Sequence, residues 1–200
     1  MAFEQRGKSD ASRKRASGFS HSRGQASGST EVRPARDKKP PTPERLEQRA
    51  RNVLLHQLAR SAKSTQQLRK ILENREIPIE IAERVLDRFT EVGLIDDQAF
   101  AETIVNSRRN FKGLSKSAIK RELNEKGVPA PFIEVAIESI TPEDDFEAAK
   151  ELAARRIRQM SSLTREVRER RLAGYLGRKG YPSSVVFAAI KFAETQIDVT

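Results

Sequence analysis

The sequence predicts an all-α fold of three tandem three-helix repeats, forming an elongated, curved modular array behind a disordered basic N-terminal arm. Three observations predict it. An eleven-residue stretch recurs without gaps at 68–78, 119–129 and 172–182, with spacings of 51 and 53 residues. Apolar residues between these copies recur at helical spacing, and no segment alternates with the period of two that strands require. A fixed period of this kind is typical of stacked units that share a core and present an extended surface.

The N-terminal segment is predicted to be disordered. Residues 1–45 contain 11 basic and 5 acidic residues, and their only large apolar residues after Met1 are Phe3, Phe19 and Val32. Such a segment buries too little surface to offset its chain entropy. It would either hold nucleic acid loosely through phosphate contacts or act as a solubilising extension, and both alternatives stay open. The expected domains are the arm and three repeats, over residues 1–41, 42–95, 96–140 and 141–196.

The first repeat is expected to begin at Thr42, a capping hydroxyl followed by Pro43 at the first helical position. Ser64 with Gln67 predicts a capping box for a second, short helix. Gly93 is placed to end the third helix in a left-handed turn. The apolar stripes of the three helices are Leu46, Ala50, Val53, Leu54 and Leu58; Leu68, Ile71 and Leu72; and Ala82, Val85, Leu86 and Phe89.

The second repeat follows the same plan, with Gly127 at a helix C-cap. Asp96 and Asp97 could suggest a metal pair, but their place at a helix start without further ligands favours N-terminal caps. The expected apolar positions are Phe100, Ala101, Ile104 and Val105; Ile119 and Leu123; and Ile133, Ala136, Ile137 and Ile140.

The third repeat is expected to begin at Thr141-Pro142, again a cap followed by proline. Gly174 and Gly177 lie inside its second helix, where each costs about 1 kcal/mol against alanine unless it permits close helix packing. The expected apolar positions are Phe146, Ala149, Leu152, Ala153 and Ile157; Val167, Leu172, Tyr175 and Leu176; and Val185, Val186, Ala189 and Ile190.

The composition excludes several classes of site. The chain has no cysteine, so thiolate chemistry and disulfides are excluded. Its two histidines are His21, in the arm, and His56, which is expected to be a packed or surface residue. No apolar run reaches the roughly 18 residues of a membrane span and no secretory signal is present, so a cytoplasmic location is expected. More than half of the net charge of +10 lies in residues 1–45, whose 11 basic and 5 acidic residues give +6.

Residues 93–102, Ser107-Arg108-Arg109, Gly113 and residues 119–128 together resemble the RecX family. The resemblance covers about residues 46–195, and the central repeat is its most specific part. The third repeat fits the family pattern at Arg170-Arg171-Leu172 and at 178–181. The first repeat departs from it, because Glu76 stands where the other repeats have glycine.

The resemblance implies a protein of DNA repair, homologous recombination and the SOS response that acts by binding, without enzymatic activity or cofactor. Family members regulate the bacterial recombinase RecA by lying in the groove of its DNA filament or capping the growing end. Either mode would limit filament extension and lower ATPase, strand-exchange and coprotease activity. A monomer with weak DNA binding of its own is expected. Three linked units can contact successive filament subunits at once, which raises avidity.

Two basic clusters inside the repeats are the candidate contacts with the filament or its DNA, although cations at helix ends can also serve the helix dipole. Cluster one is Arg108, Arg109, Lys112, Lys116, Lys120 and Arg121. Cluster two is Arg155, Arg156, Arg158, Arg165, Arg168, Arg170 and Arg171. Phe111, Tyr175 and Tyr181 could stack on bases, but their spacing is more typical of core residues.

Two other functions are compatible with the pattern. An autonomous DNA-binding or architectural protein could use helix-turn-helix-like modules, although no Arg, Asn or Gln cluster for base reading opens a helix. A helical scaffold for an unrelated protein is the other alternative. No Gly-rich phosphate loop or nucleophile–histidine–acid set is legible, so an enzyme is not expected.

Overall fold

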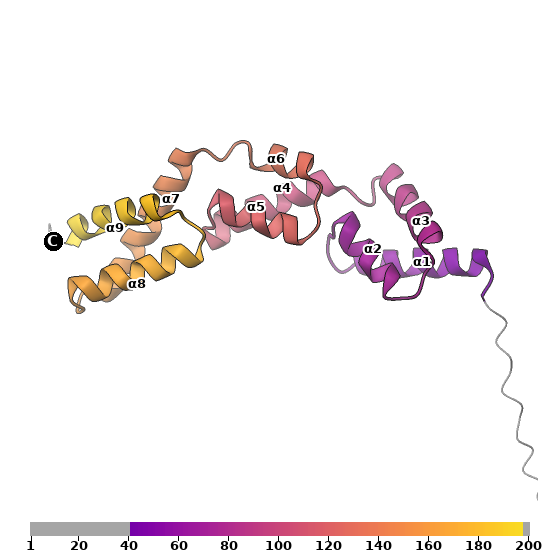
Figure 1. The fold of residues 1–200 in the computed structure, drawn as a ribbon, viewed down its shortest axis with the longest axis horizontal. Helices are drawn as coiled ribbons and strands as arrows, with labels where there is room; N and C mark the ends of the chain where they lie inside the picture. Colours follow the sequence, from indigo (N-terminus) through magenta and orange to yellow (C-terminus); the bar gives the residue numbers. More distant parts are fainter. Residues whose placement is uncertain (1–40, 198–200) are drawn as a thin grey trace, which may run out of the picture. The chain divides into compact units, whose positions relative to one another are not determined.

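The computed structural model describes residues 41–197, so the predicted N-terminal arm lies outside the described residues except for Pro41. Within this range there are nine α-helices and no strand, which confirms the all-α prediction. Figure 1 shows the helices in three successive groups of three. Their bounds are α1 Pro43–Leu58, α2 Thr65–Glu73, α3 Ile79–Glu91, α4 Asp97–Ser107, α5 Lys116–Glu125, α6 Ala130–Ile137, α7 Pro142–Ile157, α8 Arg165–Arg178 and α9 Ser183–Ile197. None of the helices in residues 41–197 has the length and apolar character of a membrane span.

Each group of three helices is a repeat with a hydrophobic core of its own. Every extensive helix–helix contact among the described residues joins helices of the same repeat. Leu54, Leu72 and Leu86 are fully or almost fully buried in repeat 1 (α1–α3). Ile119 lies at the centre of repeat 2 (α4–α6) and Leu172 at the centre of repeat 3 (α7–α9). The predicted three-helix units are therefore confirmed, and each buries its own apolar faces.

The predicted helix starts are observed. Thr42 Oγ1 accepts from the backbone N–H of Arg45 at 3.4 Å. Ser64 and Gln67 form the complete capping box, with both reciprocal hydrogen bonds at 3.2 Å. Thr141 forms a second box with Asp144. These bonds satisfy backbone donors that a helix start otherwise leaves without partners.

Asp96 and Asp97 differ in what they cap. Asp96 accepts from the backbone N–H of Ala99, so it caps its own helix as predicted. Asp97 accepts instead from the backbone N–H of Thr65 at 2.8 Å, so its carboxylate serves the start of α2 in the preceding repeat. Sequence alone could not separate these roles, because the two neighbouring acids are equally suited to a helix start.

The turn after the second helix of each repeat contains a residue with positive φ. Gly127 has φ 71° and Gly180 has φ 86°, whereas the equivalent Glu76 adopts φ 57°. A Cβ at Gly180 would lie 2.5 Å from the Cβ of Ala118 in the preceding repeat. A Cβ at Gly127 would lie 2.5 Å from Cγ of Gln66, also in the preceding repeat. Glu76 belongs to the first repeat and is exposed, so a side chain has room there despite the unfavourable backbone.

Successive repeats are joined by equivalent polar contacts. At junction A, between repeats 1 and 2, Ser64 Oγ donates to the carbonyl of Lys126 at 2.5 Å, beside the Thr65–Asp97 bond. At junction B, between repeats 2 and 3, the N–H of Ser115 donates to the carbonyl of Lys179 at 3.0 Å. The N–H of Lys116 there donates to Asp145 at 3.1 Å. At each junction, the start of the second helix of one repeat thus contacts the end of the second helix of the next repeat and one of its aspartate side chains.

The glycines in α8 do not permit close helix packing, so the expected cost in helix stability applies. Gly174 and Gly177 are both exposed. A Cβ at Gly177 would meet nothing within 4 Å, and one at Gly174 would meet only Arg178 of the same helix. The two glycines therefore weaken α8 without any compensating contact inside the described part of the chain.

Candidate interaction surface

Four of the six cations of cluster one make contacts within the fold. Arg108 donates two hydrogen bonds to Glu122, at 2.7 and 2.6 Å, and both side chains are mostly buried. Arg109 pairs with Asp145 at 2.5 Å across junction B. Lys116 donates to the carbonyl of Ile140, and Lys120 pairs with Glu134 at 2.6 Å.

The Arg108–Glu122 pair has the geometry of a structural ion pair. Two parallel N–H···O bonds fix both side chains and connect the end of α4 to α5. The hydrogen bonds from Arg108 hold the pKa of Glu122 below its ordinary value, against the opposing effect of partial burial. The same bonds raise the pKa of Arg108. Arg108 therefore stabilises repeat 2 and offers little free charge to a ligand.

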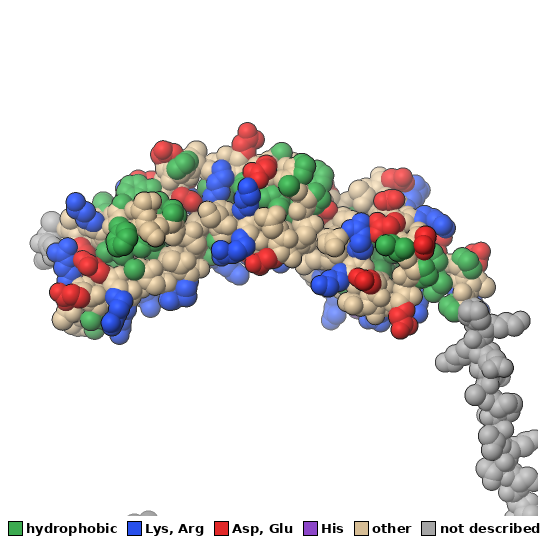
Figure 2. Space-filling model, in the orientation of Figure 1, with side chains coloured by type: hydrophobic (Ala, Val, Ile, Leu, Met, Phe, Trp, Pro, Cys, Tyr) green, Lys and Arg blue, Asp and Glu red, His purple; other side chains and the backbone are tan. Residues whose placement is uncertain are grey.

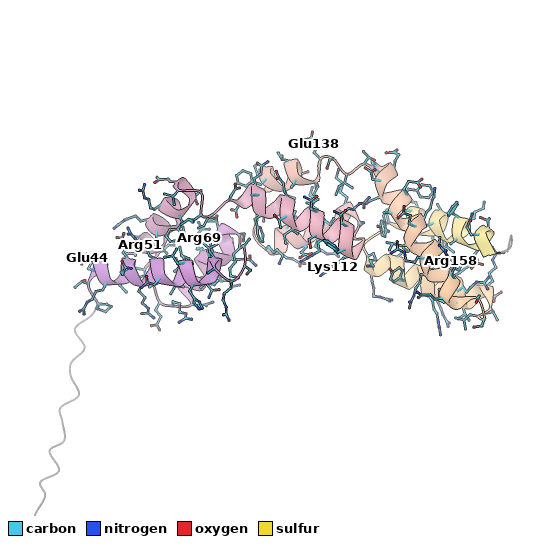
Figure 3. The ribbon with its side chains drawn as sticks, turned by 180° about the vertical axis from the view of Figure 1, so that it is seen from behind. Glu44, Arg51, Arg69, Lys112, Glu138 and Arg158 are labelled. Carbon is cyan, nitrogen blue, oxygen red and sulfur yellow. The ribbon has the colours of Figure 1, made fainter. Side chains whose placement is uncertain are left out.

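Lys112 and Arg121 are the members of cluster one that stay available. Both are exposed, and neither side chain has a hydrogen-bond or ion-pair partner among residues 41–197. Figure 3 places Lys112 and Glu138 on opposite edges of repeat 2. Lys112 therefore presents its charge on the edge away from Glu138.

Arg121 also lines a hollow of about 550 Å³ to which the second helices of all three repeats contribute. Gln67 comes from α2, Arg121 from α5 and Arg178 from α8, while Lys126 also lines the hollow but is paired with Glu122 at 3.7 Å. Glu122 and Glu125 lie on its wall as well, but Glu122 is already paired with Arg108. The hollow therefore presents cations from two repeats to one ligand.

Cluster two divides into side chains used by the fold and side chains that face solvent. Arg168 donates two hydrogen bonds to Glu194, at 3.1 and 2.5 Å, and both side chains are buried. Arg165 pairs with Glu169 along α8. Arg156 donates to Gln159 and lies 5.8 Å from the ring centroid of Tyr175.

The solvent-facing members of cluster two lie on two elements. Arg158, labelled in Figure 3, follows the end of α7 and donates to the carbonyl of Ala154. Arg155, Arg170 and Arg171 are exposed, and no partner for them occurs among the described residues. Figure 2 shows Lys and Arg side chains gathered along the edge that α8 forms with α5.

Arg178 and Lys126 were not among the residues that the sequence pattern selected. Arg178 lies seven residues after Arg171, which is two helical turns and so the same face of α8. That spacing was legible in the sequence. The position of Lys126 beside Arg178 was not, because it depends on how repeat 2 meets repeat 3.

The three aromatic candidates have different environments. Tyr181 is buried, as the core interpretation predicts, and its hydroxyl donates to the carbonyl of Gly113 at 3.2 Å. Burial raises the pKa of Tyr181 to about 12. Tyr175 packs half-buried against the core of repeat 3. For Phe111 the core interpretation is wrong, because its side chain is 86% exposed.

The chain matches the three successive domains of one family. Residues 50–89, 96–137 and 143–190 match the RecX first, second and third three-helix domains. It is 44% identical over 146 residues to "Regulatory protein RecX" of Streptomyces coelicolor, covering 73% of this chain and 78% of the relative. It is 39% identical over 149 residues to the protein of that name in Thermobifida fusca, covering 74% and 80%.

Solved structures share the fold. The crystal structure of RecX from Lactobacillus salivarius superposes with a TM-score of 0.65 at 19% identity, over 75% of this chain and 97% of that one. A second crystal structure, of a regulatory protein RecX, gives 0.62 at 28% identity over 74% and 73%. The similarity covers the three repeats, including both basic clusters.

Proposed function

The chain belongs to the RecX family, and we propose that it is a non-enzymatic regulator that binds RecA–DNA filaments and inhibits their extension. Lower ATPase, strand-exchange and coprotease activity of the recombinase would follow. The observation that carries the proposal is the hollow between the second helices, where Arg121 and Arg178 belong to different repeats but line one surface. Family membership supplies the partner, and this surface supplies a means of reaching DNA phosphates within the filament.

The physical basis is electrostatic and multivalent. Cations without intramolecular partners can neutralise phosphates and release counterions, whereas Arg108, Arg109 and Arg168 already neutralise carboxylates. Single contacts of this kind are weak in physiological salt. Linked repeats raise the effective concentration of each next contact, so an extended filament would bind much more tightly than a short DNA.

The test is single-stranded-DNA-dependent ATP hydrolysis by RecA during titration with the full-length protein. Wild-type protein is expected to inhibit well below one molecule per RecA subunit. The variant Arg121→Ala/Arg178→Ala is expected to need about tenfold more protein, with a shallower dependence on salt.

The matched control is Arg49→Ala/Arg60→Ala, which removes two exposed arginines in and just after α1. It is expected to inhibit like wild type. Equal losses in both variants would mean that net charge, and not this surface, matters. Absence of inhibition by equimolar wild-type protein would refute the proposed function. Tight, sequence-dependent binding to bare DNA would instead favour an autonomous DNA-binding protein.

A further inference from the structure

Phe111 is a large apolar side chain that the fold does not use. It lies on a single π-helical turn, Arg108–Lys112, between α4 and α5, and none of the residues of that turn is buried. Its exposure is the highest among the large apolar side chains that the structure describes. Inserted π-helical turns are uncommon and occur frequently at functional sites. An exposed phenyl ring on such a turn calls for an explanation outside the fold of the monomer.

The turn that carries Phe111 is held firmly on both sides. Within it and before the ring, Arg109 pairs with Asp145 at 2.5 Å, and Arg108 pairs with Glu122. After it, the carbonyl of Gly113 accepts from Tyr181, and the carbonyl of Lys112 accepts from Lys179. The ring therefore projects from a backbone whose position is already fixed. Binding to a partner would cost little conformational entropy in this segment.

Gly113 shows how closely this turn approaches repeat 3. It has φ 58°, and an added Cβ would lie 2.9 Å from Leu152 on α7. The turn ends in a left-handed residue pressed against the neighbouring repeat. Contacts with repeat 3 therefore help to fix the backbone that holds the Phe111 ring in solvent.

The charges near the Phe111 turn are mixed, because Lys112 on the turn is an exposed cation and acidic side chains of α7 lie nearby. Beside the turn is a hollow of about 380 Å³, lined by Arg109 and Asn110 and by three acids of α7. These acids are Asp144, Glu147 and Glu151. The hydrogen bonds at the start of α7 hold the pKa of Asp144 low, so this carboxylate is charged at neutral pH. Glu147 is paired with Lys150 at 2.7 Å, and Asp144 accepts from Thr141, so Glu151 is the acid of this hollow whose carboxylate has no hydrogen-bond or ion-pair partner among the described residues. An aromatic anchor inside such a rim of mixed charge is typical of protein interfaces.

We propose that Phe111 is an anchor that inserts into an apolar pocket on a RecA subunit. This inference rests on the proposed function and adds a protein contact to its DNA contact. The acids of the neighbouring hollow accept basic residues at the rim of that pocket. The free cations of α5 and α8 face DNA, while the turn between α4 and α5 contacts the protein.

The test compares Phe111→Ala with Phe187→Ala in the full chain. Phe187, on α9, is 70% exposed and serves as the matched control. Binding is measured by anisotropy to labelled single-stranded DNA, both bare and coated with RecA in a non-hydrolysable ATP analogue. Phe111→Ala is expected to bind the coated DNA at least tenfold more weakly, and Phe187→Ala to bind like wild type. Both variants are expected to keep the wild-type thermal midpoint, because neither ring is buried. Phe111→Leu, which keeps an apolar side chain, is expected to recover part of the loss.

The outcomes separate the inference from the function it rests on. If wild type binds coated DNA and Phe111→Ala binds it with the same affinity, the anchor is overturned and the proposed function stays intact. Failure of wild type to bind coated DNA overturns both. A loss by Phe111→Ala that is equally large on bare DNA overturns the protein anchor in favour of base stacking.

Discussion

Junctions A and B begin from the same contacts and differ in what surrounds them. Junction A consists of Ser64 with the Lys126 carbonyl and Thr65 with Asp97, and no ion pair crosses it among the described residues. Junction B adds the Arg109–Asp145 pair and two side chains that donate to carbonyls of the Phe111 turn. Both junctions have a contact between a serine at a helix start and the carbonyl of a lysine at a helix end, and a helix-start N–H that donates to an aspartate. Only junction B adds an ion pair and further side-chain contacts to these.

The difference indicates that repeats 2 and 3 form the more strongly coupled pair. In a repeat array, stability is approximately the sum of the stabilities of the repeats and of their interfaces. Each repeat here has a core of its own, so the junctions decide how cooperatively the chain unfolds. Junction A is therefore expected to open first.

The largest effect is expected from removing the acid at junction B. Asp145→Ala leaves the mostly buried guanidinium of Arg109 without its carboxylate and the N–H of Lys116 without an acceptor. We expect a loss of about 2–4 kcal/mol in the free energy of unfolding. The equivalent Asp97→Ala removes only the cap on Thr65 and should cost about 1 kcal/mol. Urea unfolding followed by circular dichroism measures both changes.

Asp145→Asn is the control for this pair of variants. It keeps an oxygen that can accept from Lys116 but loses the charge that Arg109 requires, so an intermediate loss is expected. Equal losses for Asp145→Ala and Asp97→Ala would show that the ion pair adds nothing to junction B. The two junctions would then be energetically alike.

A smaller, graded effect is expected along the positive-φ turns. Gly180→Ala would force a Cβ against Ala118 and Ser115, whose atoms cannot rotate away, and should cost about 2–3 kcal/mol. Gly127→Ala meets the exposed side chain of Gln66, which can partly give way, and should cost about 1–2 kcal/mol. Glu76→Gly should be neutral or stabilising, within about 1 kcal/mol, because it relieves the backbone without removing a buried contact.

The same unfolding measurement tests this order. In all three repeats a proline follows the positive-φ residue by two positions, as Pro78, Pro129 and Pro182. The three turns are therefore matched at this proline. If Glu76→Gly lowered the free energy of unfolding as much as Gly127→Ala, the argument that the preceding repeat, and not the turn itself, requires glycine would be contradicted.

The smallest effect concerns pH and Tyr181. Its pKa is raised from 10.0 to about 12 by burial, so the folded state favours the neutral phenol. The resulting stabilisation is complete below pH 10 and is lost as the pH rises through about 12. Wild-type protein should therefore lose stability across this interval. Tyr181→Phe should lack this dependence and lose about 1 kcal/mol at neutral pH with the bond to Gly113. Unfolding midpoints of both proteins, measured between pH 9 and 12, test this difference. Parallel plots of midpoint against pH would contradict the role assigned to Tyr181.

The sequence predicted the interior of each repeat well for a local reason. A helical stripe such as Leu68, Ile71 and Leu72 and a capping box such as Ser64 with Gln67 involve residues within one or two turns of each other. Their geometry is set by the α-helix itself. The family resemblance rested on particular residues, most specifically 93–102 and 119–128 of the central repeat, and it is confirmed by all three domain matches.

The candidate surface was less predictable because charge in a sequence does not say which partner a side chain meets. Arg108 and Arg121 look alike as members of one basic run, yet Arg108 faces Glu122 across 14 residues and Arg121 faces a hollow. Arg168 likewise meets Glu194 across 26 residues. Both ion pairs are long-range in sequence, and no helical spacing predicts them.

The sequence alone determined that this chain is all-helical and where most helices begin, because these follow from periodicities and caps within a few residues. The recurrence of one eleven-residue stretch determined that the chain repeats three times, and a resemblance in particular residues indicated the family. The tertiary structure decided which cations are free, why glycine occupies two of three equivalent turns, and that Phe111 faces solvent. These features depend on contacts between residues that are distant in sequence. The ion pairs that occupy cations span 14, 26 and 36 residues, and contacts between repeats span 62 and 68 residues. At such contacts burial and ion pairing are set by the packed neighbour and not by local sequence.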